Sequence, residues 1–124
     1  MTYIMVFLGA GIGGALRHGV NAAALRLGLT AFPYATLFIN VAGSLAMGLI
    51  AGWFALRGEA SPLWRLFLTT GVLGGFTTFS AFSLETVLLW ERGEAGAALA
   101  YVAASVITAL ASLVAGLWLI RTMA

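Results

Sequence analysis

The chain has 124 residues, of which 62% are hydrophobic and only 8% are charged. Soluble domains are about 45–50% apolar and about 25% charged, so this composition argues against a soluble enzyme and a disordered chain. We therefore predict an integral membrane protein. The chain has no cysteine, which excludes disulfides and thiolate metal sites. Its six arginines form no basic run, so no nucleic-acid partner is expected.

Apolar stretches divide the chain into four candidate membrane spans. A helix needs about 20 residues to cross the hydrocarbon core. A chain of 124 residues therefore accommodates four spans with short loops and leaves no room for a soluble domain. The expected spans cover approximately residues 4–27, 34–56, 66–90 and 97–120. The prediction is an all-α integral membrane protein, a single four-helix domain over residues 1–124 with neighbouring spans antiparallel.

The arginines give little information on orientation. They divide between the two sides of the membrane as Arg57, Arg65 and Arg121 against Arg26 and Arg92, and Arg17 is ambiguous because it lies within a span, so the count is three against two or three. Orientation follows an excess of Lys and Arg on one side, and this excess is very small. Two interpretations remain open: the chain inserts in both orientations, or local context or partner proteins decide its orientation.

The third expected span has the most unusual sequence. Glycines that weaken a helix precede a group of hydroxyl residues: Gly71, Gly74, Gly75, Thr77, Thr78, Ser80 and Ser83. Non-helical backbone at membrane depth is tolerated where it is buried in protein or lines a cavity, and broken helices bind ions in transporters. Two interpretations remain open: a broken helix beside an ion path, and a continuous helix with a small-residue packing face.

Phenylalanines follow the glycines of the third span at intervals of three. Phe76, Phe79 and Phe82 lie near one face if the segment is helical. Such rings pack in a core or contact lipid, but a second interpretation exists. An aromatic ring has a negative face and a positive edge, so a ring edge can contact a dehydrated anion.

Polar side chains also occur in the second and fourth spans. Asn40 is the only residue of the second span with a side-chain amide, and it faces either a neighbouring helix or a water-accessible path. Tyr101 and Ser105 are four residues apart in the fourth span, so their hydroxyls share a face. An interfacial aromatic belt is an alternative explanation for Tyr101.

Arg17 and Glu85 are the ionisable residues deepest in apolar surroundings. Charges at such positions are costly and usually face the bundle interior or water, which makes both residues functional candidates. They could pair with each other, and an unpaired Arg17 near a pore mouth would attract anions. The single histidine, His18, is interpreted as interfacial. No catalytic constellation or phosphate loop is present, so the chain is not expected to be an enzyme.

Three segments together resemble the Fluc fluoride channels, also called the CrcB family, over essentially the whole chain. They are GGFTTFSAFS at residues 74–83, GAGIGGALR at residues 9–17 and TLFINVAGS at residues 36–44. The resemblance implies a fluoride-selective ion channel that passively exports fluoride across the bacterial inner membrane. It also implies an antiparallel, dual-topology homodimer with two pores and a structural sodium ion at its centre.

The resemblance also implies roles for individual residues. It places the following residues along or beside the fluoride pathway: Asn40, Phe79, Ser80, Phe82, Tyr101 and Ser105. Arg17 corresponds to an arginine near the aqueous vestibule, and Glu85 to a glutamate shortly after the break, which we assign to the vestibule as well. The backbone carbonyls of Gly74 and Thr77 would hold sodium in both subunits.

Two positions depart from the family pattern. Ala81 stands where a Thr is common, and Ala109 stands where a Ser commonly completes the polar track. These departures put the rate of conduction in doubt more than the function. Two rival functions are a small multidrug or cation exporter and a non-transporting membrane assembly subunit. The exporter needs a carboxylate in the first span, which carries Arg17 instead, and the assembly subunit needs no broken helix.

Overall fold

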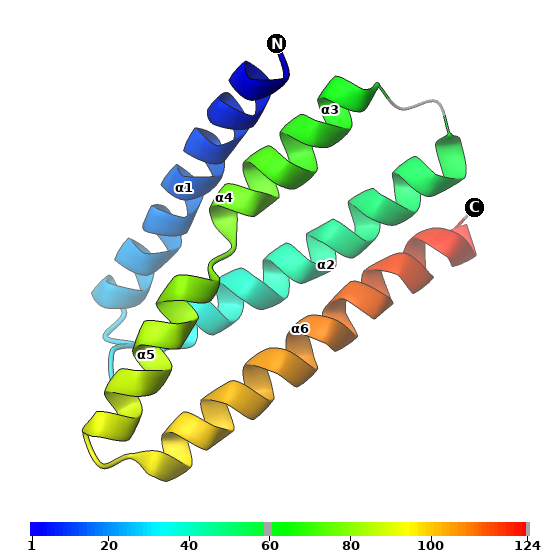
Figure 1. Cartoon of the computed structure of the whole chain (residues 1–124). Helices are drawn as coiled ribbons and strands as arrows, with labels where there is room; N and C mark the ends of the chain where they lie inside the picture. The colour runs from blue at the N-terminus through cyan, green and yellow to red at the C-terminus, as the bar shows by residue number, and fades with distance from the viewer. Residues whose placement is uncertain (59–60, 124) are drawn as a thin grey trace.

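A computed structural model describes residues 1–58 and 61–123. These residues contain four helical units long and apolar enough to cross a membrane, and they contain no strand. The units are α1 (Thr2–Arg26), α2 (Tyr34–Arg57), the composite third span (Pro62–Glu91) and α6 (Ala95–Met123). The predicted all-helical, four-span architecture is therefore confirmed. Both ends of the chain lie at the same end of the bundle, as an even number of spans requires (Figure 1).

The third span is a helix interrupted near its middle. It consists of α3 (Pro62–Leu66), the π-helical segment η1 (Phe67–Leu73), the short α4 (Gly74–Phe76) and α5 (Phe79–Glu91). Between α4 and α5, Thr77 and Thr78 have extended backbones with ψ of 158° and 122°. Of the two interpretations of this span, the broken helix is correct. The break follows the glycines, whereas the π-helical segment was not expected from the sequence.

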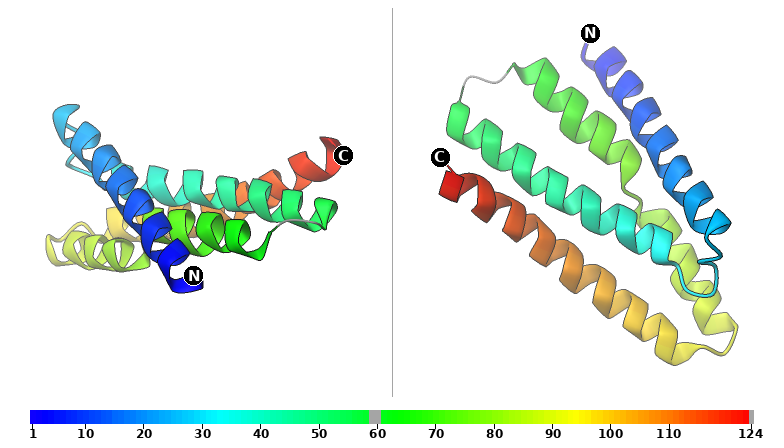
Figure 2. Two further views of the ribbon diagram at one scale, coloured as in Figure 1. Left: turned by 90° about the horizontal axis from the view of Figure 1, so that it is seen from above. Right: turned by 180° about the vertical axis from the view of Figure 1, so that it is seen from behind.

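The helices pack in two close pairs, with α1 against the first half of the third span and α6 alongside α2 (Figures 1 and 2). Glycine makes both approaches possible. A Cβ added to Gly75 would lie 2.8 Å from the Cα of Ala10, and one added to Gly116 would lie 2.6 Å from the carbonyl oxygen of Leu45. Backbone therefore touches backbone in each pair, which is how helices associate in lipid.

Short turns connect the helices at the end of the bundle away from the termini. Gly28 follows α1 with a φ of +74°, and Gly93 follows α5 with a φ of +81°, conformations that favour glycine. Arg92 pairs with Glu94 at 3.0 Å and also donates to the carbonyl oxygen of Ala31 at 3.3 Å. This arginine thereby connects the two turns.

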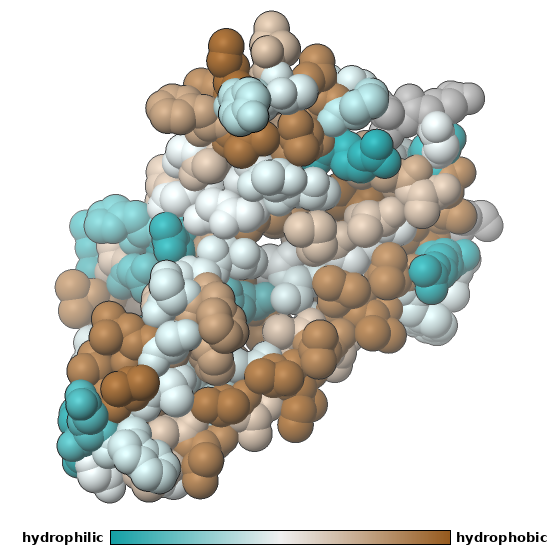
Figure 3. All heavy atoms as spheres, viewed as in Figure 1, coloured by the Kyte–Doolittle hydropathy of each residue, from teal (hydrophilic) through white to brown (hydrophobic). Residues whose placement is uncertain are grey.

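Large apolar side chains cover much of the outer surface. Figure 3 shows brown, hydrophobic residues along α6 and teal, hydrophilic residues near the ends of the helices. Phe7 on α1 and Leu110 and Trp118 on α6 are exposed. A small buried cluster forms around Tyr101, Leu89 and Ala98 where α5 meets α6. Most of the apolar surface is thus available to lipid or to another protein chain.

Candidate functional site

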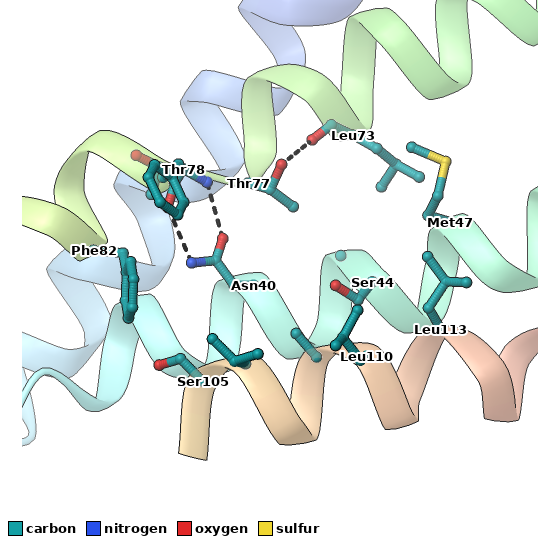
Figure 4. Close-up of a pocket in the computed structure, with 14 residues that line it drawn as sticks. Asn40, Ser44, Met47, Leu73, Thr77, Thr78, Phe82, Ser105, Leu110 and Leu113 are labelled. Carbon is teal, nitrogen blue, oxygen red and sulfur yellow. Dashed lines mark hydrogen bonds between the residues drawn. The ribbon is translucent and has the colours of Figure 1, made fainter. Parts of the chain in front are cut away.

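The side chain of Asn40, on α2, bonds to the backbone of the break. Its Nδ2 donates to the carbonyl oxygen of Thr78 at 3.0 Å, and its Oδ1 accepts from the Thr78 N–H at 2.9 Å (Figure 4). The hydroxyl of Thr78 accepts from the Ala81 N–H at 3.1 Å and so caps the start of α5. Side chains thus satisfy three of the backbone groups that the break exposes, the N–H and carbonyl of Thr78 and the N–H of Ala81.

A pocket of about 430 Å³ lies beside the break, between α2, the third span and α6. It brings together four of the predicted pathway residues: Asn40, Phe79, Phe82 and Ser105. Figure 4 shows Asn40 and Ser105 on neighbouring helices, with Phe82 beside them. The other two predicted pathway residues, Ser80 and Tyr101, are not part of the pocket lining.

Two hydrogen-bond donors beside this pocket have no partner among the described residues. Ser105 is only 7% exposed, and its hydroxyl has no hydrogen-bond partner within the described part of the chain. The Asn40 amide has two N–H groups, of which one donates to Thr78 and the other to no described residue. A buried hydroxyl without a partner is costly, so its presence beside a pocket points to a ligand or water there.

The aromatic rings near the break form a chain that leads away from this pocket. The ring centroids of Phe79 and Phe82 are 5.5 Å apart, and those of Phe82 and Tyr101 are 5.1 Å apart. Phe79 is 78% exposed, whereas Tyr101 is completely buried. Phe76 was expected to share a face with Phe79 and Phe82 if the segment were helical, and that condition is not met, because the extended residues of the break separate Phe76 from the other two.

Tyr101 connects the ring chain to Glu85. Its hydroxyl donates to the Glu85 carboxylate at 3.3 Å. Glu85 lines a second pocket of about 320 Å³, together with Asn21 and Arg92. The suggested pairing of Arg17 with Glu85 is wrong, because the ion pair among the described residues is Arg92–Glu94. Arg17 itself lies half-buried on α1 and is not among the lining residues of either pocket.

Ser80 lies just after the break and is exposed. Its hydroxyl is 3.4 Å from that of Thr78, within reach of a weak hydrogen bond. Of the two positions that depart from the family pattern, Ala109 lines the pocket at the break. Ala81 takes part through its backbone N–H, which donates to Thr78.

The carbonyl groups of Gly74 and Thr77 both lose their ordinary helical donors. In a continuous helix, Gly74 would accept from the N–H of Thr78, and Thr77 from that of Ala81. In this structure the Thr78 N–H donates to Asn40 and the Ala81 N–H to the Thr78 hydroxyl. These two carbonyls belong to the group of four that the end of α4 leaves without helical donors.

Ser44 was not assigned to the site from the sequence, and Thr78 was expected only as one of several hydroxyls that bond backbone groups freed by a break. Ser44 lines the pocket one turn after Asn40, and its spacing of four could have revealed it. Thr78 links the break to both α2 and α5, as its bonds to Asn40 and Ala81 show. A threonine three residues before a helical N–H is an ordinary capping signal, which could have placed the start of α5.

Comparison with known proteins gives a consistent family assignment. The family described as CrcB-like protein, Camphor Resistance (CrcB), matches residues 4–117. A protein of Methylobacterium nodulans named fluoride-specific ion channel FluC is 63% identical over 98% of this chain and 97% of its own length. Proteins with the same name from Rhodopseudomonas palustris and Granulibacter bethesdensis are 59% and 57% identical, each over 99% of this chain and over 99% and 97% of their own lengths.

Proposed function

This chain belongs to the CrcB family, and from that premise we propose that it is a fluoride-selective channel. The channel would let fluoride leave the cell passively, and it is not an enzyme. The relatives come from bacteria, which supports a location in a bacterial inner membrane. The observation that carries the proposal is the pocket at the break, which is lined by both Ser105, whose hydroxyl has no described partner, and Asn40.

The chemistry of this pocket suits a small, strongly hydrated anion. A pore must replace the water that it strips from an ion, and its sites must not bind so tightly that the ion cannot leave. Asn40 and Ser105 supply N–H and O–H donors, and the rings of Phe79 and Phe82 supply electropositive edges. No Arg or Glu lies among the described residues that line the pocket. A path without full charges favours fast release.

The working unit that we propose is an antiparallel homodimer with two pores. Phe79 lines the pocket and yet is 78% exposed, so the wall that it forms is completed by something outside this chain. A second copy would supply that wall. The two sides of the membrane carry nearly equal numbers of arginines, which supports dual topology because neither orientation is favoured.

We also propose a structural sodium ion between the two copies. The carbonyls of Gly74 and Thr77 fit this role, because the hydrogen bonds of Asn40 and Thr78 remove their helical donors. Backbone carbonyls are the ligands by which proteins bind dehydrated alkali cations. Two copies would contribute four such oxygens. A cation bound there would join the two broken helices and make the centre of the dimer electropositive.

The rival functions have less support. The described part of α1 contains no carboxylate that could exchange protons for cations, as a small multidrug exporter requires. A non-transporting assembly subunit needs no broken helix, and this third span is broken at Thr77 and Thr78.

Fluoride efflux from liposomes tests the proposed function. Purified protein is reconstituted into vesicles loaded with potassium fluoride, and a fluoride electrode records the release after a potassium ionophore is added. We expect rapid fluoride release and little chloride release from matched potassium chloride vesicles. Absence of fluoride release, or equal release of both anions, would contradict the proposal.

A further inference from the structure

A groove between α2 and the first half of the third span continues beyond the pocket at the break. Its outer part is a hollow of about 540 Å³, lined by residues that include Met47, Ala51, Arg65, Thr69 and Thr70. Met47 lines both this hollow and the pocket at the break. The two spaces are therefore neighbours along one groove. The helix α3, which carries the lining residue Arg65, lies at the end of the bundle that carries both termini (Figure 1).

On α2, one face of the helix lines both spaces. Asn40, Ser44 and Met47 line the pocket at the break, and Met47 and Ala51 line the outer hollow. Spacings of three and four residues place these side chains above one another on a helix. The α2 wall is therefore continuous from the break to the outer hollow.

On the third span, the opposite wall is equally continuous. Thr77 and Leu73 line the pocket at the break, and Thr69 and Arg65 line the outer hollow. These four residues follow one another at intervals of four. The π-helical segment has wider turns than an α-helix, which keeps residues four apart well aligned. The Thr69 hydroxyl donates to the Arg65 carbonyl at 2.7 Å. Arg65, which also lines the outer hollow, is the outermost of the four residues along this wall.

We propose that this groove is the water-filled approach to the pore and that Arg65 attracts fluoride into it. This inference rests on the proposed function. The approach has apolar walls, two threonine hydroxyls and a single cationic side chain. The described lining contains no carboxylate that would neutralise this charge. Arg65 is exposed, so its charge raises the local anion concentration without binding an anion tightly. Arg17, which the family resemblance places near a vestibule, is not among the lining residues of this groove.

Charge reversal at Arg65 tests the electrostatic role. Fluoride efflux is measured for wild type, Arg65→Glu and Arg65→Lys in solutions of low and high ionic strength. A single charge acting across a few ångströms of water changes the local concentration of an ion about threefold. Charge reversal changes the interaction energy by twice the amount that charge removal does. Arg65→Glu should therefore reduce flux about tenfold at low ionic strength. The loss should shrink to less than about twofold near 1 M of an inert salt, where charges are screened within about 3 Å. Arg65→Lys should conduct like wild type.

Arg121→Glu is the matched control. Arg121 lies in the last turn of α6, at the same end of the bundle, and is not among the residues that line the groove. The control should lose clearly less flux than Arg65→Glu at low ionic strength, because the charge of Arg121 does not line the groove and acts on it from farther away. Equal losses for both charge reversals, or a loss at Arg65 that persists in high salt, would overturn the inference. A wild-type protein that conducts no fluoride would instead overturn the proposed function.

A cysteine variant tests the groove independently of charge. The chain contains no cysteine, so Ala51→Cys introduces a unique thiol in the wall of the outer hollow. We expect the unlabelled variant to conduct, and we expect the negatively charged reagent 2-sulfonatoethyl methanethiosulfonate to label it and lower the flux at least severalfold. Ala111→Cys, exposed on α6 outside both groove walls, is the control and should keep its flux after the same treatment. Labelling of Ala51→Cys without loss of flux, or no labelling, would contradict the proposed approach.

Discussion

Asn40 takes the place of a helical peptide group for Thr78. Its side-chain amide accepts from the Thr78 N–H at 2.9 Å and donates to the Thr78 carbonyl at 3.0 Å. Thr78 is buried, so water does not satisfy these backbone groups. One amide therefore stabilises the break, frees the Gly74 carbonyl from its helical donor and keeps a second N–H beside the pocket.

The first prediction concerns the loss of this amide. Asn40→Ala leaves two buried backbone groups of Thr78 without partners, which should lower the stability of the folded protein by about 2–4 kcal/mol. Flux should fall about tenfold or more, since a lost donor worth about 1.4 kcal/mol in the barrier has that effect. Thermal unfolding in detergent and liposome efflux measure the two changes. Asn21→Ala, an exposed amide on α1, is the control, and an equal loss in both variants would contradict a special role for Asn40.

The second prediction separates a ligand role from a structural role at Ser105. Its buried hydroxyl has no partner in the described structure, so Ser105→Ala should leave the stability unchanged or raise it by up to about 1 kcal/mol. Flux should nevertheless fall severalfold, because the pocket loses a donor for the anion. Thr108→Ala is the control, because the Thr108 hydroxyl already bonds to the Ala104 carbonyl. Unchanged flux in Ser105→Ala would show that its hydroxyl does not touch the ion.

Sodium dependence provides the third prediction. If the carbonyls of Gly74 and Thr77 hold sodium, replacing sodium throughout with N-methyl-D-glucamine should reduce flux and the fraction of dimer. A ligand that binds only the folded assembly stabilises it by about 2.7 kcal/mol at 100 times its dissociation constant, so its removal should be visible in thermal unfolding as well. Full flux and dimer content in solutions free of sodium would contradict the site.

The four spans could be predicted from the sequence because lipid imposes a simple rule. Each crossing needs about 20 apolar residues, and the chain interrupts its apolar stretches near Pro33, Arg57 and Glu91. The helices extend two or three residues beyond several expected limits, as at Met123, because the flanking polar residues continue a helix that is already formed. The break was left open, since glycine and threonine also occur in continuous membrane helices.

The positions of the polar partners could not be predicted. Local sequence shows that Thr78 is able to cap a helix, but not that Asn40, 38 residues away, bonds to its backbone. Arg17 and Glu85 are both ionisable residues within apolar stretches, which suggested that they pair with each other. Glu85 instead accepts a hydrogen bond from Tyr101 of α6. Such pairings depend on how the helices pack, and single-span patterns contain no information on that packing.

The fourth prediction concerns the close contact between α1 and the third span. Gly75→Ala places a Cβ 2.8 Å from the Cα of Ala10, and backbone on both sides leaves little room for adjustment. The expected destabilisation is about 1–3 kcal/mol, as for other overpacked sites. Gly96→Ala is the control, because no described atom lies within 4 Å of the added Cβ, and it should be neutral or stabilise by about 0.5–1 kcal/mol. Similar melting temperatures for the two variants would contradict the tight packing.

The fifth prediction tests whether Tyr101 and Glu85 act as a unit. Tyr101→Phe keeps the ring against Phe82 but removes the hydroxyl that donates to Glu85 at 3.3 Å. If this bond fixes the carboxylate at the end of the ring chain, Tyr101→Phe and Glu85→Gln should each lower flux, and the double variant should lose no more than the worse single variant. That non-additivity is expected for residues in direct contact, with a coupling of about 0.5–3 kcal/mol. Tyr34→Phe, in which an exposed ring loses its hydroxyl, should conduct like wild type. Losses that multiply in the double variant would show that the two groups contribute independently.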